Sequence, residues 1–134
     1  MEKTIIIVPD AGPKRDFLIA KIKKLYHQKV GLKWEGCKKA HLFQCRYCGQ
    51  EKLIPKEICS GRILRWSTWT PSALKLLDEI LSDGDISFVD LKIYKRHPKP
   101  MYKIKTYIND KYIKILGKSI PDVISHLWIE LKAG

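Results

Sequence analysis

The fold is decided by residues 86–116, which read ISFVDLKIYKRHPKPMYKIKTYINDKYIKIL. Apolar and polar residues alternate through Ile86–Tyr94 and again through Met101–Ile108, a pattern typical of half-buried strands. The pair Asn109-Asp110 predicts a tight hairpin turn into a third strand over 112–116. The stretch therefore predicts a three-stranded antiparallel sheet.

One helix is predicted before this sheet, over residues 70–81. Thr70 is a favourable N-cap residue, and Pro71 suits the first helical position. Leu74, Leu77 and Leu81 then recur on one helix face, which we expect to face the core.

A second helix is predicted after the sheet. The run Ser119-Ile120-Pro121-Asp122 is a variant of the capping box, with Asp122 at the third helical position. Residues 66–134 are therefore expected to form an α+β domain of order α-β-β-β-α, in which two helices cover one face of the three-stranded antiparallel sheet.

The chain before this domain divides into two predicted segments. Residues 1–32 contain a strand over 4–8 and a helix over 14–28, and residues 33–65 form a small zinc-binding segment. The loop between that strand and helix has no phosphate-binding glycine pattern, so no ligand is assigned to it.

All four cysteines lie between residues 37 and 59, together with His41. In the run Cys45-Arg46-Tyr47-Cys48-Gly49, one tight turn brings two thiols to a single ion. We expect a structural Zn²⁺ ion bound by Cys37, Cys45, Cys48 and Cys59. In the alternative set, His41 replaces Cys37 or Cys59.

Free thiols and a redox pair are the competing interpretations of these cysteines. The chain opens without a secretory signal pattern, so we expect a reducing, intracellular setting, in which a CxxC pair more often binds metal than forms a structural bridge. No HxE or HExxH motif accompanies the cysteines, which argues against a catalytic zinc. No apolar run is long enough to cross a membrane.

Positive charge is concentrated in one part of the chain, whose formal net charge is +12. Residues 91–118 hold nine lysines and arginines against the single acidic residue Asp110, a net +8. Such a block attracts polyanions, although lysines also cover the wet face of many sheets. The candidate nucleic-acid-binding residues, some of them close to tryptophans that can stack on bases, are Arg62, Arg65, Lys95, Arg96, Lys99, Lys103 and Lys105.

Three stretches of the chain resemble a family of small phage-encoded proteins with a phage ABA sandwich domain. They are Ala11-Gly12 with RDFLIA at 15–20 and KVG at 29–31; WSTW at 66–69 with Ala73-Leu74 and Leu77; and LGKSIPDVI at 116–124 with LKA at 131–133. The resemblance implies a phage or prophage origin, and hence the cytoplasm of a bacterial host, but no enzymatic role. The N-terminal strand, the longer first helix and the spread-out cysteines depart from the family pattern.

The order α-β-β-β-α is also similar to that of double-stranded RNA-binding domains. Those domains grip phosphates with lysines at the start of their second helix, whereas the corresponding start here is Ser119-Ile120-Pro121-Asp122, with a carboxylate in that place. The basic loop over 95–99, however, lies where those domains have the loop that enters the minor groove, which favours the comparison.

We therefore expect a non-enzymatic, zinc-stabilised phage or prophage accessory protein that binds nucleic acid through a basic surface. The alternative is a phage counter-defence protein that binds a host protein or sequesters a phosphorylated small-molecule signal, and an enzyme with an open zinc site is the least favoured. The sequence indicates no partner for His27 or His126 and no oligomeric state.

Overall fold

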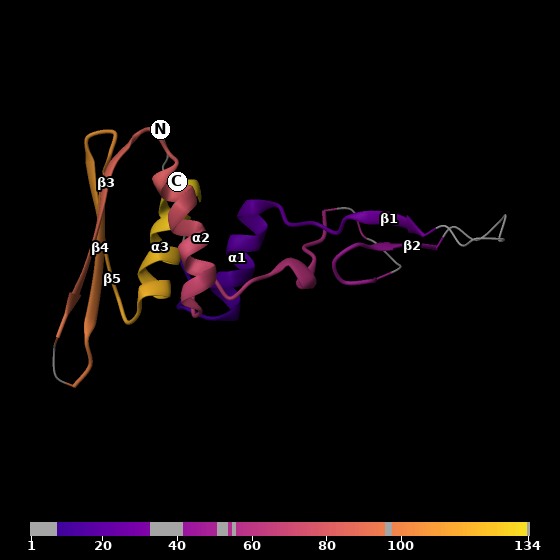
Figure 1. Cartoon of the computed structure of the whole chain (residues 1–134), viewed down its shortest axis with the longest axis horizontal. Helices are drawn as coiled ribbons and strands as arrows, with labels where there is room; N and C mark the ends of the chain where they lie inside the picture. Colours follow the sequence, from indigo (N-terminus) through magenta and orange to yellow (C-terminus); the bar gives the residue numbers. More distant parts are fainter. Residues whose placement is uncertain (1–7, 33–41, 51–53, 55, 96–97, 134) are drawn as a thin grey trace. The chain divides into compact units, whose positions relative to one another are not determined.

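The computed structural model describes residues 8–32, 42–50, 54, 56–95 and 98–133 (Figure 1). The chain divides into two compact units. The first comprises residues 1–19 and 64–134, and the second comprises residues 20–63. The strand predicted over 4–8 lies outside the described residues, apart from Val8.

The first unit confirms the predicted α-β-β-β-α order. Its elements are α2 (Thr70–Leu81), β3 (Ile86–Tyr94), β4 (Met101–Ile108), β5 (Lys111–Gly117) and α3 (Ile120–Ala133). The three strands form an antiparallel sheet in the order β3-β4-β5. Figure 1 shows α2 and α3 on the same side of this sheet, and within the unit no described element lies on the other side.

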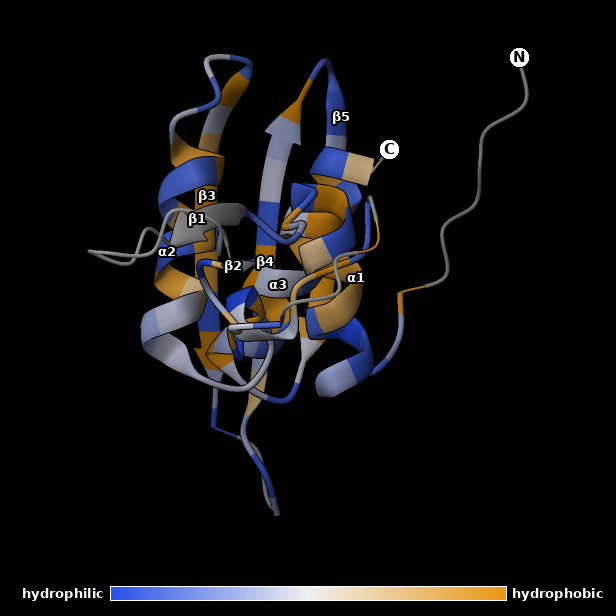
Figure 2. Cartoon of the chain, turned by 90° about the vertical axis from the view of Figure 1, so that its right-hand side faces the viewer, coloured by the Kyte–Doolittle hydropathy of each residue, from blue (hydrophilic) through white to orange (hydrophobic). Residues whose placement is uncertain are grey.

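The core of the first unit lies between the sheet and the two helices. Bands of hydrophobic and hydrophilic residues alternate along the strands in Figure 2. On the side of the sheet that the helices cover, Ile104 and Ile115 are buried, whereas Leu91 and Ile93 of β3 are 36% and 54% exposed. Fully buried members of this core are Leu76, Ile80, Ile104, Val123, Ile124 and Leu127. Each such side chain stabilises the fold by roughly 1.5–3 kcal/mol relative to an exposed one.

The predicted core face of α2 is wrong in part. Leu74 and Leu81 are 45% and 58% exposed, whereas Ala73, Leu76 and Ile80 are fully buried. The difference arises because α2 packs chiefly on α3 and only lightly on β3, so that its buried stripe is turned away from the leucines.

Among its described residues, the second unit contains little regular structure. Helix α1 (Pro13–Lys23) begins in the first unit and ends in the second, and it is shorter than predicted because Lys24 adopts a left-handed conformation with φ 57°. The strands β1 (Lys29–Leu32) and β2 (Leu42–Cys45) form an antiparallel hairpin, and the 3-10 helix η1 (Ser60–Arg62) follows Cys59.

The second unit has almost no apolar core among its described residues. From residue 20 to residue 63, only Ala20, Cys45 and Cys59 are buried among the residues whose side chains the structure describes. In the described part of this unit, a bound metal would add stability that buried apolar side chains do not supply.

Candidate metal centre and basic sheet face

Backbone hydrogen bonds of the second unit bring His27 next to Cys59. The N–H of Cys59 donates to the carbonyl of Leu25 at 2.9 Å, and the N–H of His27 donates to the carbonyl of Glu57 at 3.3 Å. Residues 25–27 and 57–59 therefore run antiparallel to each other, with an isolated bridge between them.

The CxxC turn supplies the other two sulfurs, as the sequence predicted. The N–H of Gly49 donates to the carbonyl of Cys45 at 2.9 Å, and Gly49 has φ 75°, which glycine adopts without strain. The N–H of Tyr47 points at the Cys45 sulfur at 3.4 Å. This is the tight turn needed to present Cys45 and Cys48 to one ion.

His27, Cys45, Cys48 and Cys59 form a cluster able to hold a metal ion. Their ligand atoms all lie within 4.8 Å of one another. The sulfurs of Cys45 and Cys59 are 3.6 Å apart, and the Cys48 sulfur is 3.3 Å from Nδ1 of His27. Two sulfurs bound to one zinc at 2.3 Å and tetrahedral angles lie about 3.8 Å apart, so the donor set fits a tetrahedral ion.

A carboxylate lies behind the histidine. Nε2 of His27 is buried and has no hydrogen-bond partner among the described residues, and the nearest acidic oxygen, Oε1 of Glu57, is 3.9 Å away. Metal-binding histidines usually direct their second nitrogen to such a group, which orients the ring and raises its basicity. With Nδ1 facing the sulfurs, His27 is placed to use Nε2 in this way.

The two buried thiols differ in acidity. Burial raises the pKa of Cys45, but hydrogen bonds, first of all from the backbone of Tyr47 and Cys48, outweigh it and lower the pKa to about 5. Burial, followed by the contacts with Cys45 and Cys48, raises the pKa of Cys59 to about 11. Cys45 therefore ionises first, and a bound cation is what would hold both sulfurs as thiolates.

The sequence missed one of these four groups. Cys45, Cys48 and Cys59 were predicted as ligands, but His27 had no identified partner, since nothing in its sequence spacing links it to the CxxC pair. The predicted ligand Cys37 and its alternative His41 lie outside the described residues. None of the three described cysteines forms a disulfide.

Besides the metal-ligand cluster, a second candidate site is the side of the β3-β4-β5 sheet that faces away from α2 and α3. Because cross-strand partners share a face, the pairing register identifies its members. We call this surface the open face, and it comprises Phe88, Asp90, Lys92, Tyr94, Met101, Lys103, Lys105, Tyr107, Tyr112, Lys114 and Leu116.

The open face is positively charged. Lys105 of β4 lies between Asp90 of β3 and Lys114 of β5, and Lys103 pairs in register with Lys92. The carboxylate of Asp90 is 3.9 Å from the ammonium groups of both Lys92 and Lys105. Four lysines against one aspartate leave a net charge of +3.

The predicted nucleic-acid-binding residues fall in different places. Lys103 and Lys105 belong to the open face, and Lys95 and Lys99 are exposed in the loop between β3 and β4, whereas Arg96 lies outside the described residues.

Two of the three arginines of the predicted set, Arg62 and Arg65, lie against aromatic rings. The guanidinium of Arg62 lies 4.4 Å from the ring centre of Tyr47 and donates to the carbonyl of Tyr26 at 3.0 Å. Arg65 lies 5.7 Å from the ring of Trp69, which is 50% exposed.

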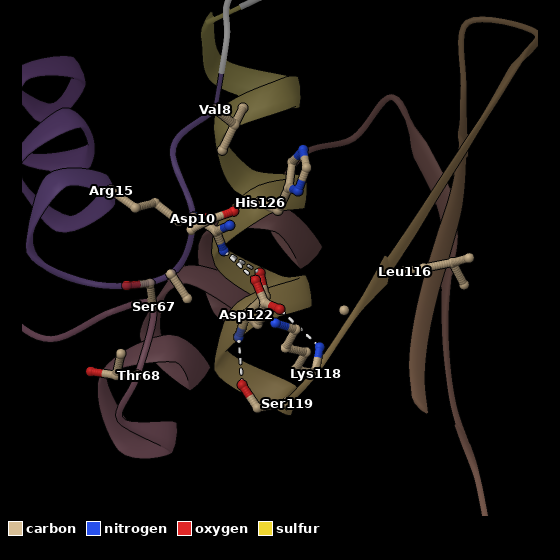
Figure 3. Close-up of a pocket in the computed structure, with 12 residues that line it drawn as sticks. Val8, Asp10, Arg15, Ser67, Thr68, Leu116, Lys118, Ser119, Asp122 and His126 are labelled. Atoms are coloured by element: carbon tan, nitrogen blue, oxygen red, sulfur yellow. Dashed lines mark hydrogen bonds and ion pairs between the residues drawn. The ribbon is translucent and has the colours of Figure 1, made fainter. Parts of the chain in front are cut away.

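A pocket of about 530 Å³ lies elsewhere in the first unit, beside the start of α3 (Figure 3). Its charged lining consists of Arg15 and Lys118 on one hand and Asp10 and Asp122 on the other, with His126 at one side. The acidic and basic groups balance, so the pocket has little net charge when His126 is neutral.

The start of α3 is already capped from within the chain. The N–H of Asp122 donates to Oγ of Ser119 at 3.1 Å, and the N–H of Lys118 donates to Oδ2 of Asp122 at 2.8 Å (Figure 3). The predicted capping arrangement is confirmed, and a carboxylate occupies the position where a helix N-terminus would bind an anion.

Comparison with family models, curated proteins and solved structures gave no match to this chain. Among the described residues, no helix is both long and apolar enough to span a bilayer.

Proposed function

We propose that the protein is a non-enzymatic, zinc-stabilised phage or prophage accessory protein that binds nucleic acid and acts in the cytoplasm of a bacterial host. The observation that carries the proposal is the charge of the open face, where Lys92, Lys103, Lys105 and Lys114 outnumber the single carboxylate of Asp90. Phage origin is supported by the sequence resemblance alone.

The open face suits a phosphate backbone because its lysines lie on all three strands. Adjacent strands are about 4.8 Å apart and alternate residues of one strand about 6.7 Å apart, so the ammonium groups form a dense array. Phosphates that bind there release counterions, which makes affinity fall with salt. For four contacts to a single strand, log affinity is expected to fall against log salt with a slope of about −3.

In this proposal the metal is Zn²⁺ and its role is structural. Three sulfurs and one imidazole are a donor set typical of structural zinc, and four protein donors leave no open coordination position for a substrate. The second unit buries almost nothing else among its described residues, so metal binding would supply most of its folding energy.

The alternative, a counter-defence protein that binds a host protein or sequesters a phosphorylated signal, would use the pocket beside α3 for the small ligand. The pocket supports it less well, because Asp122 already pairs with Arg15 and the remaining charges of its lining, Asp10 and Lys118, cancel. A nucleotide that saturates one site per chain, with a mild salt slope and no effect of open-face substitutions, would favour this alternative.

The test is binding of zinc-loaded protein to labelled single- and double-stranded DNA and RNA between 50 and 300 mM salt. The double variant Lys103→Glu/Lys105→Glu is expected to weaken binding at least about tenfold and to flatten the salt slope. The matched control is Lys14→Glu/Lys75→Glu, which makes the same charge change at exposed positions away from the open face. Equal binding by the two variants, or no binding by the unmodified protein, would overturn the proposal.

A further inference from the structure

We propose that the ligand of the open face is a single strand, whose unpaired bases stack on a cluster of three rings: Phe88, Tyr107 and Tyr112. This inference rests on the proposed nucleic-acid function and specifies the strand type that the open face selects.

The ring cluster lies at one end of the open face, near the turn between β4 and β5. The rings of Tyr107 and Tyr112 have centroids 5.2 Å apart, and those of Phe88 and Tyr112 are 6.4 Å apart, both edge-to-face. The hydroxyl of Tyr107 donates to Asp110 at 3.2 Å, which fixes one ring of the cluster. The cluster is therefore organised before any ligand arrives.

Phe88 lies on the open face because it alternates in β3 with Asp90, Lys92 and Tyr94, and the strand is irregular next to it. The register between β3 and β4 shifts between Ile86 and Val89. Thr106, whose side chain lies on the buried side of the sheet, donates a hydrogen bond from its hydroxyl to the carbonyl of Phe88 at 2.6 Å. This hydrogen bond satisfies the backbone at the irregularity, and the Phe88 ring remains 41% exposed. A large apolar ring held at the surface in this way is available for contact with a ligand.

Cations alternate with rings across the open face. The ammonium of Lys105 lies 6.0 Å from the ring centre of Tyr112, and that of Lys103 lies 5.2 Å from the ring of Tyr94. Tyr112 is 65% exposed. A single strand presents phosphates and base faces in alternation, and proteins that bind such strands combine basic grooves with stacking rings.

Neither a duplex nor a second copy of the chain is complementary to both the exposed rings and the lysines of the open face. In a duplex the base faces are stacked inside, so the rings would find only phosphates and sugars and would contribute little. A second copy packed face to face would bring two sets of four lysines together, which is unfavourable at a desolvated interface. An unpaired strand alone satisfies rings and charges together.

The experiment compares Tyr112→Ala with Tyr112→Phe, which keeps the ring, and with Leu74→Ala, which truncates an exposed apolar residue on α2. The probes are labelled twenty-nucleotide oligothymidylate and oligouridylate and a twenty-base-pair DNA duplex, each at 100 mM salt. Tyr112→Ala is expected to lose about tenfold or more in affinity for the single strands and to keep its affinity for the duplex. Tyr112→Phe and Leu74→Ala are expected to bind all probes as the unmodified protein does.

The experiment distinguishes failure of the proposed nucleic-acid function from failure of the stacking inference. If the unmodified protein binds no probe, the proposed function fails and this inference with it. If it binds, but prefers the duplex or loses nothing on Tyr112→Ala, the nucleic-acid function stands and the stacking inference is overturned. The ratio of affinities for the two single strands shows whether DNA or RNA is preferred.

Discussion

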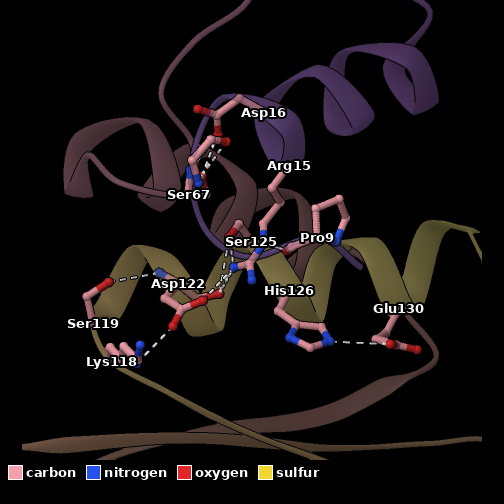
Figure 4. Close-up of polar contacts among 11 residues, drawn as sticks. Pro9, Arg15, Asp16, Ser67, Lys118, Ser119, Asp122, Ser125, His126 and Glu130 are labelled. Atoms are coloured by element: carbon pink, nitrogen blue, oxygen red, sulfur yellow. Dashed lines mark hydrogen bonds and ion pairs between the residues drawn. The ribbon is translucent and has the colours of Figure 1, made fainter. Parts of the chain in front are cut away.

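Arg15, which is buried, and Asp122, which is partly buried, form an ion pair although they are 107 positions apart in the sequence (Figure 4). Nη1 of Arg15 lies 2.5 Å from Oδ1 of Asp122 and 2.9 Å from the carbonyl of the same residue, while Nε donates to the carbonyl of Pro9 at 2.8 Å. Arg15 is only 4% exposed. The pair therefore fastens the start of α1 to the start of α3 within the first unit.

Removal of one partner of this pair is expected to destabilise the first unit strongly. Arg15→Met leaves the carboxylate of Asp122 partly buried without its cation, and breaking a buried pair in this way costs roughly 3–5 kcal/mol. Urea unfolding followed by tryptophan fluorescence gives the change in free energy of unfolding. Lys14→Met, the same kind of truncation at an exposed neighbouring residue, is expected to change it by less than about 0.5 kcal/mol. Similar values for both variants would show that the ion pair contributes little.

The fourth zinc ligand is expected to be His27 and not Cys37. The cluster already provides four donors within 4.8 Å, including Nδ1 of His27. Loss of a residue that merely orients a ligand lowers metal affinity by about 10–100-fold, so His27→Ala should lower it by about 100-fold or more. Competition with a chromogenic chelator measures this affinity. Cys37→Ser is the control expected to retain one zinc per chain, and a large loss on that substitution would instead place Cys37 in the coordination sphere.

A methyl group at position 61 is expected to disturb the metal centre. A Cβ atom on Gly61 would lie 2.8 Å from the Tyr47 carbonyl oxygen and 3.3 Å from Cβ of Cys48, so the two cysteine-bearing loops would have to separate. Gly61→Ala should therefore cost about 1–3 kcal/mol, seen as weaker zinc binding in the same chelator competition. Gly84→Ala, where a Cβ meets nothing within 4 Å, is the control expected to behave as the unmodified protein. Unchanged zinc affinity in Gly61→Ala would mean that the loops tolerate separation.

The acidity of Tyr94 is expected to report on the open face. A hydrogen bond to Lys103, and then the charges of nearby lysines, lower the pKa of Tyr94 below its usual value. Lys103→Met should raise this pKa, because the phenolate loses its main cationic partner. Since the folded-state pKa is depressed, the interaction stabilises the fold only at alkaline pH and is lost as pH falls through that pKa.

Ultraviolet absorbance of the phenolate against pH measures the shift, with Tyr94→Phe used to subtract the other tyrosines. Lys75→Met, on α2, should leave the titration of Tyr94 unchanged. If the titration of Tyr94 is also unchanged in Lys103→Met, then Lys103 does not form the hydrogen bond with Tyr94.

Local sequence patterns determined the strands of the sheet, the cap of α3 and the CxxC turn of this protein. Alternation of apolar and polar residues determined the strands, with Met101–Ile108 predicted at both of its observed ends. Capping chemistry identified Ser119 as the residue that caps the start of α3, and the spacing of Cys45 and Cys48 indicated the metal turn. These features depend on interactions between residues only a few positions apart, which a sequence displays directly.

Only the tertiary structure decided the features that depend on distant contacts. His27 joins the cysteines because residues 25–27 pair with 57–59, and the buried face of α2 follows from its packing on α3. Phe88 meets Tyr112 because β3 and β5 both pair with β4, which places the two rings on the open face. In each case the partner is far along the chain, and the geometry that unites the two residues exists only once the backbone has folded.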